Sequence, residues 1–87
     1  MQNVTLYILR GESGKRYVGI TTDLSRRLFD HSQGKTRGGQ VLGKFRLLLT
    51  ESYPDYPAAR TREKFLKSGQ GRRWLDQVEQ EMVTRNR

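Results

Sequence analysis

YVGITTDLSRRLFDH, residues 17–31, is the stretch from which the rest of the fold can be inferred. Its first three residues are typical of the end of a strand, and the threonines that follow are typical of a turn. An amphipathic helix is predicted to begin near Thr22 or Asp23, because either side chain can cap free N–H groups at a helix start. Gly34 is a natural C-terminal cap, so we expect the helix to stop there.

The faces of this helix separate two adjacent arginines. At about 100° per residue, Leu24 and Leu28 share an apolar face. Arg27 and His31, one turn apart, fall on the flank of that face, whereas Arg26 points the other way. The pattern therefore predicts that Arg26 is a solvated charge and that Arg27 lies at the edge of the packed surface.

Length and charge limit the possible functions. The 87 residues suffice for one compact domain, residues 1–87. Lys and Arg number 17 against 9 Asp and Glu, a net charge of +8, which favours a polyanionic partner, with nucleic acid as the default. A membrane surface is the competing partner, but no predicted helix combines a wide apolar face with a cationic one. No apolar run approaches the roughly 20 residues that span a bilayer.

Cysteine is absent and histidine occurs once. This excludes a disulfide framework and thiolate chemistry, and it argues against a structural zinc site. The N-terminal segment MQNVTLYILRG lacks a charged leader followed by an apolar core and a cleavage site, so we expect no signal peptide and a cytoplasmic location.

A β-hairpin is predicted upstream of the helix. Residues 4–9 are β-branched and aliphatic, and residues 15–19 return as a second strand. A three-residue loop, Glu12-Ser13-Gly14, with its glycine in the left-handed conformation puts Tyr7 and Tyr17 on one face of the sheet. A loop of two or four residues would separate them, since a slip of one residue reverses every side chain.

Residues 33–43, QGKTRGGQVLG, are glycine-rich and basic, and they predict an exposed loop that could follow a phosphate backbone. Gly34-Lys35-Thr36 is like the end of a nucleotide-binding P-loop. However, Phe29 stands where that motif needs a glycine, and a helix precedes the segment instead of a strand. We therefore expect no nucleotide cofactor.

The second half of the chain predicts one strand and two helices. Residues 44–51 form a central or edge strand with Phe45, Leu47 and Leu49 on one side. Pro57 suits the first position of a helix that runs to about Ser68 and is ended by residues 69–71. A last helix covers residues 72 to about 84, and Asn86 and Arg87 are expected to fray. The docking stripe of this last helix comprises Trp74, Leu75, Val78 and Met82.

Glu63 is the acidic residue with an unusual predicted position. Ala59, Glu63 and Leu66 lie within one arc of their helix, so the carboxylate emerges on the side that faces the sheet. A carboxylate there is costly unless it is paired with a cation or a metal. An ion pair with Lys67, four residues on, is the commoner explanation.

The other polar candidates have ordinary explanations when each is taken alone. Tyr7 and Tyr17 are by default packing groups with a wet hydroxyl. His31 alone is more often a surface or capping residue than a catalyst, and Arg27 could pair with Asp23. Their order along the chain is what indicates a function.

That order resembles the GIY-YIG nuclease domain. The matching elements are Leu6-Tyr7-Ile8, then Tyr17-Val18-Gly19, then a helix with Arg27 and His31, and then Glu63 in a later helix. Residues 62–75, REKFLKSGQGRRWL, are similar to the small stand-alone, single-domain branch of that family.

The resemblance implies an α/β (α+β) fold with a three-stranded antiparallel sheet flanked by about three helices, in the order β-β-α-β-α-α. It also implies endonucleolytic hydrolysis of phosphodiester bonds with one divalent metal, Mg²⁺ or Mn²⁺. The implied catalytic residues are Tyr7, Tyr17, Arg27 and His31, and the implied metal ligand is Glu63. Two departures are LYI in place of GIY and Ile20 where some members have lysine. The appended DNA-binding modules of larger members are missing, which favours selection of structure over sequence.

The chemistry of the set fits phosphodiester hydrolysis. Arg27 can make a planar two-point contact with phosphoryl oxygens. A tyrosine with a pKa of about 10 becomes a plausible base beside cations, and the pattern leaves open whether Tyr7 or Tyr17 is that base.

Two alternatives use the same basic surface. One is a module that binds DNA or RNA without turnover, and the other is an adaptor for an acidic protein. The predicted nucleic-acid contacts, with DNA the most expected partner, are Lys35, Arg37, Lys44, Lys67, Arg72 and Arg73. Oligomeric state is not predicted.

Overall fold

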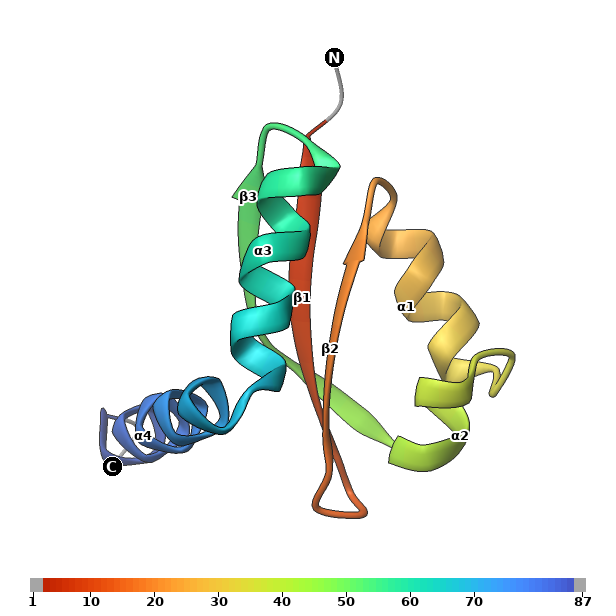
Figure 1. Cartoon of the computed structure of the whole chain (residues 1–87). Coiled ribbons are helices and arrows are strands. Elements are labelled where there is room, and N and C mark those ends of the chain that lie inside the picture. The colour runs from red at the N-terminus through yellow and green to blue at the C-terminus, as the bar shows by residue number, and fades with distance from the viewer. Residues whose placement is uncertain (1–2, 86–87) are drawn as a thin grey trace.

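The computed structural model describes residues 3–85, and Asn86 and Arg87, which were expected to fray, lie outside the described residues. Three strands and four helices are described (Figure 1). In chain order they are β1 (Val4–Gly11), β2 (Arg16–Thr21), α1 (Leu24–Ser32), α2 (Arg37–Leu42), β3 (Phe45–Tyr53), α3 (Tyr56–Lys67) and α4 (Gly69–Arg85).

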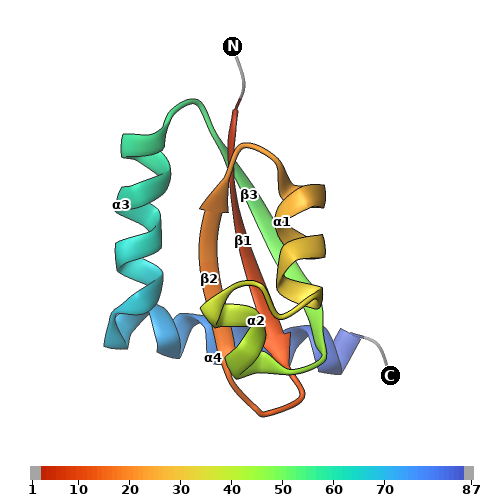
Figure 2. The ribbon, with the colours of Figure 1, turned by 90° about the vertical axis from the view of Figure 1, so that its right-hand side faces the viewer.

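The strands form one antiparallel sheet in the order β2-β1-β3, so β1 is central and β3 is an edge strand. In Figures 1 and 2, α1 and α2 lie on one side of the sheet and α3 on the other. The predicted fold class is confirmed, with one helix more than the predicted order contained.

The central strand is buried on both faces, and each face has its own core. One face carries Leu6 and Ile8, which pack with residues of β2, α3 and α4, namely Val18, Leu66 and Leu75. The other face carries Tyr7 and Leu9, which pack with Leu42 of α2. Tyr7 is thus placed beneath α1 and α2, away from the aliphatic core under α3.

The hairpin has the predicted three-residue loop. The Gly11 N–H donates to the Lys15 carbonyl at 2.8 Å, and Gly14 has a φ of +89°, in the left-handed region that glycine adopts without strain. Tyr7 therefore pairs with Gly19, and Leu9 pairs with Tyr17. This register puts both tyrosines on one face, as predicted.

The third strand contains a bulge that the sequence pattern did not predict. Ile8 pairs with Leu49 while its neighbour Leu9 pairs with Leu47, so β3 has one extra residue, Leu48, at this point. Leu47 and Leu49 consequently lie on opposite faces. The prediction that Phe45, Leu47 and Leu49 share one side was wrong.

The glycine-rich segment 33–43 was predicted as an exposed loop, and this prediction was also wrong. Residues Arg37–Leu42 form the short helix α2, whose Gly38 and Gly39 are buried. Thr36 caps it, because its Oγ1 accepts the Gly39 N–H at 2.9 Å. Packing of the two glycines against α1 and β2 stabilises a helix that glycine-rich composition alone would disfavour.

The two C-terminal helices begin earlier than predicted. Asp55 caps α3, and Pro57 occupies its second position instead of its first. Ser68 ends α3 and also caps α4, since its Oγ accepts the Gly71 N–H at 3.2 Å. Residues 69–71 therefore belong to α4, where Gly71 packs against the Phe65 carbonyl.

The predicted docking stripe of α4 is only partly buried. Leu75 is fully buried and Trp74 packs against the core, whereas Met82 is exposed.

None of the helices within residues 3–85 is at once long enough and apolar enough to cross a membrane.

Candidate active site

Tyr7, Tyr17 and His31 form a compact cluster on the face of the sheet beneath α1 and α2. The Tyr7 hydroxyl lies 2.9 Å from His31 Nε2, and both residues are almost fully buried. The Tyr17 ring is 6.0 Å from the Tyr7 ring and 4.8 Å from the His31 ring, between centroids. Tyr17 is only partly buried, so it is the phenol of the pair that reaches solvent.

The other ring nitrogen of His31 is held by Thr36. His31 Nδ1 is hydrogen-bonded to Thr36 Oγ1, the same oxygen that accepts the Gly39 N–H. The cap of α2 thus also orients the buried imidazole. Sequence reasoning missed Thr36, although a threonine directly before a short helical segment is a recognisable capping signal.

Two glycines make room for the rings. A Cβ at Gly19 would lie 2.5 Å from the Tyr7 hydroxyl oxygen. A Cβ at Gly38 would lie 2.7 Å from the Tyr17 ring and 3.1 Å from His31 Cε1. The cluster can pack this closely only because backbone without side chains borders it on both sides. Gly38 was not singled out from the sequence, where it belonged to the supposed loop.

Arg27 lies beside the phenols, on the flank of α1 where it was predicted. Its pKa is raised chiefly by the Tyr7 phenol, and the Tyr17 phenol raises it further. Arg26 is exposed, and its backbone N–H donates to the capping carboxylate of Asp23. Among the described ion pairs, none joins Asp23 to Arg27, so that alternative for Arg27 finds no support.

The protonation states of the cluster follow from its burial. Burial lowers the pKa of His31, and the Arg27 charge lowers it further, while Asp30 opposes both. The imidazole is therefore neutral at neutral pH. Burial raises the pKa of the Tyr7 phenol to about 12, although the Arg27 guanidinium opposes this. Tyr7 consequently keeps its proton at neutral pH.

Tyr7→Phe is expected to remove a pH dependence of stability at alkaline pH. The folded pKa of Tyr7, about 12, lies above the ordinary value of 10.0. The stability that this proton contributes is present below about pH 10 and is lost as the pH rises toward 12, by about 2–3 kcal/mol. Urea unfolding between about pH 9 and 12 measures the loss.

The control for this experiment is Tyr56→Phe, which alters an exposed tyrosine of α3. We expect this variant to retain the alkaline decline of the wild-type protein. An equal decline in Tyr7→Phe and in the wild type would contradict the assignment to Tyr7.

Glu63 is buried, as the helical arc predicted, with 7% of its surface exposed. Its carboxylate oxygens contact Arg60 at 3.1 Å and Lys67 at 3.2 Å. The predicted ion pair with Lys67 is therefore present. Glu63 lies on α3, which packs on the sheet face opposite the tyrosine cluster, and the described hydrogen bonds of its carboxylate go to Arg60 and Lys67 and not to Tyr7, Tyr17 or His31.

A basic cleft at the free edge of β2 connects the two faces. In Figure 2, α3 runs alongside β2, the outer strand of the sheet, and contacts between the two elements agree with this view. The cleft has a volume of about 840 Å³, and Tyr17 and Lys67 both line it. It therefore extends from the partly buried Tyr17 to Lys67, the lysine that pairs with Glu63.

A comparison with protein families assigns this arrangement. Residues 3–75 match the model of the GIY-YIG catalytic domain. The chain belongs to the GIY-YIG nuclease family. The match includes the residues of both tyrosine motifs and of the helices that carry Arg27, His31 and Glu63.

Similar GIY-YIG proteins carry the name UPF0213. A UPF0213 protein of Serratia proteamaculans is 53% identical over 45 residues, which are 51% of this chain and 42% of that protein. UPF0213 protein BH0048 of Halalkalibacterium halodurans is 43% identical over 56 residues, 60% of this chain and 56% of that protein. The matched segments thus span about half the length of these relatives.

A solved structure supports the GIY-YIG fold over a longer stretch. The solution NMR structure of UPF0213 protein BH0048 from Bacillus halodurans superposes with a TM-score of 0.56 at 35% sequence identity. The superposition covers 88% of this chain and 85% of the BH0048 chain.

The divalent metal expected of a GIY-YIG nuclease can be tested against the donor set. Within residues 3–85, no group of three acidic, His or Cys side chains could hold a metal. Mg²⁺, however, commonly binds through one or two carboxylates, substrate phosphate and water. The Arg60 and Lys67 side chains are 58% and 56% exposed, so they can move away from Glu63. The residues thus fit a metal that binds together with its substrate.

The six basic residues predicted to contact nucleic acid are all exposed, but they do not form one surface. Lys67 and Arg72 line the cleft beside Tyr17. Lys44 lines a separate cavity next to α1. Lys35 and Arg37 precede and begin α2, so Arg37 is a helical residue and not part of a loop.

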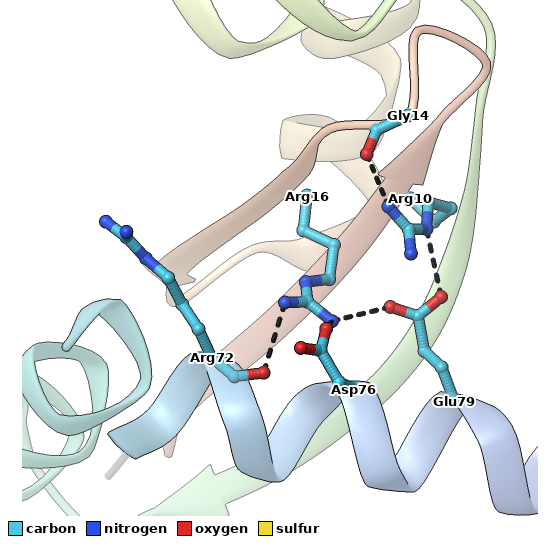
Figure 3. A network of polar contacts seen from close by, with 6 residues as sticks. All are labelled: Arg10, Gly14, Arg16, Arg72, Asp76 and Glu79. Atoms are coloured by element: carbon cyan, nitrogen blue, oxygen red, sulfur yellow. Dashed lines mark hydrogen bonds and ion pairs between the residues drawn. The ribbon is translucent and has the colours of Figure 1, made fainter. Parts of the chain in front are cut away.

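Two other arginines of the cleft have a structural role (Figure 3). Arg10 and Arg16 each contact the Glu79 carboxylate at 2.9 Å, and Arg16 also contacts Asp76 at 2.8 Å. These pairs hold the hairpin against α4. In the described ion pairs, Lys15 and Arg72 have no acidic partner, which leaves both available to phosphate.

Proposed function

We propose that this GIY-YIG domain is a metal-dependent endonuclease that hydrolyses phosphodiester bonds in DNA and selects DNA structure over sequence. The observation that supports this most directly is the cluster of Tyr7, Tyr17 and His31 with Arg27 at its phenols, next to a basic cleft. Nucleic acid is the partner that a net charge of +8 and a nuclease fold favour together.

Tyr17 is our candidate for the general base, because it is the phenol that both reaches solvent and lines the basic cleft. Tyr7 is buried, keeps its proton and holds the His31 ring. Arg27 would contact phosphoryl oxygens, where negative charge accumulates in the transition state.

Glu63 would hold Mg²⁺ or Mn²⁺. A bound divalent ion supplies a Lewis acid that neutralises charge on the phosphate and on the leaving oxygen. The contribution of this chain is the Glu63 carboxylate, whose ion-pair partner Lys67 lines the same cleft as Tyr17.

A binding module without turnover is the second candidate. One observation favours it, namely that Arg60 and Lys67 already occupy the Glu63 carboxylate. Such a module would bind nucleic acid through the same cleft, with salt-sensitive affinity and no products.

Glu63→Gln separates the two candidates. The chain is incubated with single-stranded, nicked, flapped and branched DNA in Mg²⁺ or Mn²⁺, and products are resolved on denaturing gels. We expect cleavage of flapped or branched DNA, slowed about a hundredfold by Glu63→Gln. Glu81→Gln, an exposed acid of α4, serves as the control and should cleave at the wild-type rate.

Cleavage of no substrate, or cleavage at the same rate by Glu63→Gln, would contradict the proposed nuclease. Salt-sensitive binding that Glu63→Gln leaves unchanged, with no products, is the result expected of the binding module.

A further inference from the structure

We propose that the cavity beside α1 binds an unpaired nucleobase, stacked on Phe29 with its flanking phosphates near Lys35 and Lys44. This inference rests on the proposed nucleic-acid partner and specifies the substrate class as DNA with unpaired nucleotides. The proposed base site does not use Tyr7, Tyr17 or Glu63.

The cavity lies where α1 ends and β3 begins, and it has a volume of about 810 Å³. Two aromatic rings line it, Phe29 from α1 and Phe45 from β3, together with Gln33 and Lys44. Aromatic surface combined with a few polar groups is typical of sites that bind flat, partly polar molecules.

Phe29 is placed to serve as a stacking platform. It is 56% exposed, although it belongs to a helix whose opposite face is packed. Lys35 Nζ lies 5.7 Å from the centroid of its ring. Single-stranded nucleic acid is commonly bound by an exposed aromatic ring that stacks on a base while nearby cations attract the phosphates.

The charge around the cavity matches this ligand. Lys44 is a lining residue, and Lys35 Nζ lies over one side of the Phe29 ring, 5.7 Å from its centroid. The Glu12 carboxylate lies beside Gly43 at the rim, and Asp30 lies between the lining residues Phe29 and His31 on α1. Paired bases are stacked inside a duplex and cannot reach an aromatic ring on a protein surface, so the site favours unpaired nucleotides.

The cavity adjoins the candidate active site. His31 is one of its lining residues, and Nε2 of the same residue lies 2.9 Å from the Tyr7 hydroxyl. The Phe45 ring meets His31 edge-on, with centroids 6.2 Å apart. A nucleotide in this cavity would therefore lie next to the cluster that carries the proposed chemistry.

Phe29→Ala tests the inference through binding in EDTA, without cleavage. The probes are a fluorescein-labelled oligothymidine of about twelve nucleotides, within the usual site size for such proteins, and a fluorescein-labelled blunt duplex that is fully paired, with G·C pairs at both ends. Fluorescence anisotropy gives the affinities. We expect Phe29→Ala to weaken single-strand binding about tenfold and duplex binding less than about twofold.

Two further variants make the result specific to the ring. Phe29→Tyr keeps an aromatic platform and should bind the single strand like the wild type. Val41→Ala alters another exposed apolar residue, on α2 and outside the cavity lining, and should leave both affinities unchanged.

Equal weakening of single-strand and duplex binding by Phe29→Ala, or no weakening of either, would overturn the proposed base site. Because binding is measured without metal, a failure here leaves the nuclease proposal intact. Equally, the binding measurement would detect the base site even if the protein cleaved no DNA.

Discussion

Arg27→Ala should lower the rate of phosphodiester cleavage by about a thousandfold, while Arg26→Ala should leave it within about twofold of wild type. The two arginines are neighbours on α1 with the same charge. Arg27 is partly buried beside the Tyr7 and Tyr17 phenols, whereas Arg26 is exposed on the other side of the helix. The comparison therefore separates a contact in the site from a general loss of positive charge.

The size of the expected effect follows from the contact that this guanidinium would make with phosphoryl oxygens, where negative charge accumulates in the transition state. Arg27→Lys should recover little of the lost rate, because an ammonium cannot replace the planar two-point contact. Single-turnover cleavage rates on a flapped DNA measure all three variants. Equal losses in Arg26→Ala and Arg27→Ala would reduce the role of Arg27 to long-range charge.

The part of the site built from local pattern was predictable. The three-residue hairpin loop determines the strand register, and the register puts Tyr7 and Tyr17 on one face. Helical periodicity likewise placed Arg27 at a packed edge and turned Glu63 inward. Each of these predictions needed only neighbouring residues and a known period.

The part that depends on contacts between distant segments was not predictable. Residues 37–42 have two glycines and little apolar surface, and their helix is stable because it packs on α1 and β2. Because the sequence did not predict α2, it also could not predict the hydrogen bond between Thr36 and His31. The bulge in β3 was not predictable either. The regular alternation of Phe45, Leu47 and Leu49 gives no indication of the extra residue in the strand.

Glu63 was correctly predicted to be buried, but that prediction did not include the sheet face on which its helix packs. The carboxylate is buried, but α3 packs on the face opposite the tyrosines. A cleft at the β2 edge is lined both by Tyr17 and by Lys67, the ion-pair partner of this acid. Periodicity defines the side of a helix, whereas topology decides which face of the sheet that side meets.

Gly39→Ala should destabilise the fold by about 3 kcal/mol, a large share of the 5–15 kcal/mol typical of a small domain. A Cβ at Gly39 would lie 2.2 Å from the His31 carbonyl oxygen and 3.0 Å from His31 Cα. These are backbone atoms, which cannot rotate away as a side chain can. The added methyl group must therefore separate α2 from α1.

Helix propensity predicts the opposite sign, which makes this substitution informative. Alanine in place of a helical glycine should stabilise by about 1 kcal/mol where there is space for the methyl group. Gly69→Ala provides that control, since the nearest atom to its Cβ is Arg73 NH1 at 3.9 Å. Urea unfolding at neutral pH should rank Gly69→Ala at or above wild type and Gly39→Ala well below it.

Because the Gly39 N–H also bonds to Thr36 Oγ1, separation of α2 should release His31 and shift its ring resonances. A stabilised Gly39→Ala with unshifted His31 resonances would mean that α2 does not pack on the buried imidazole.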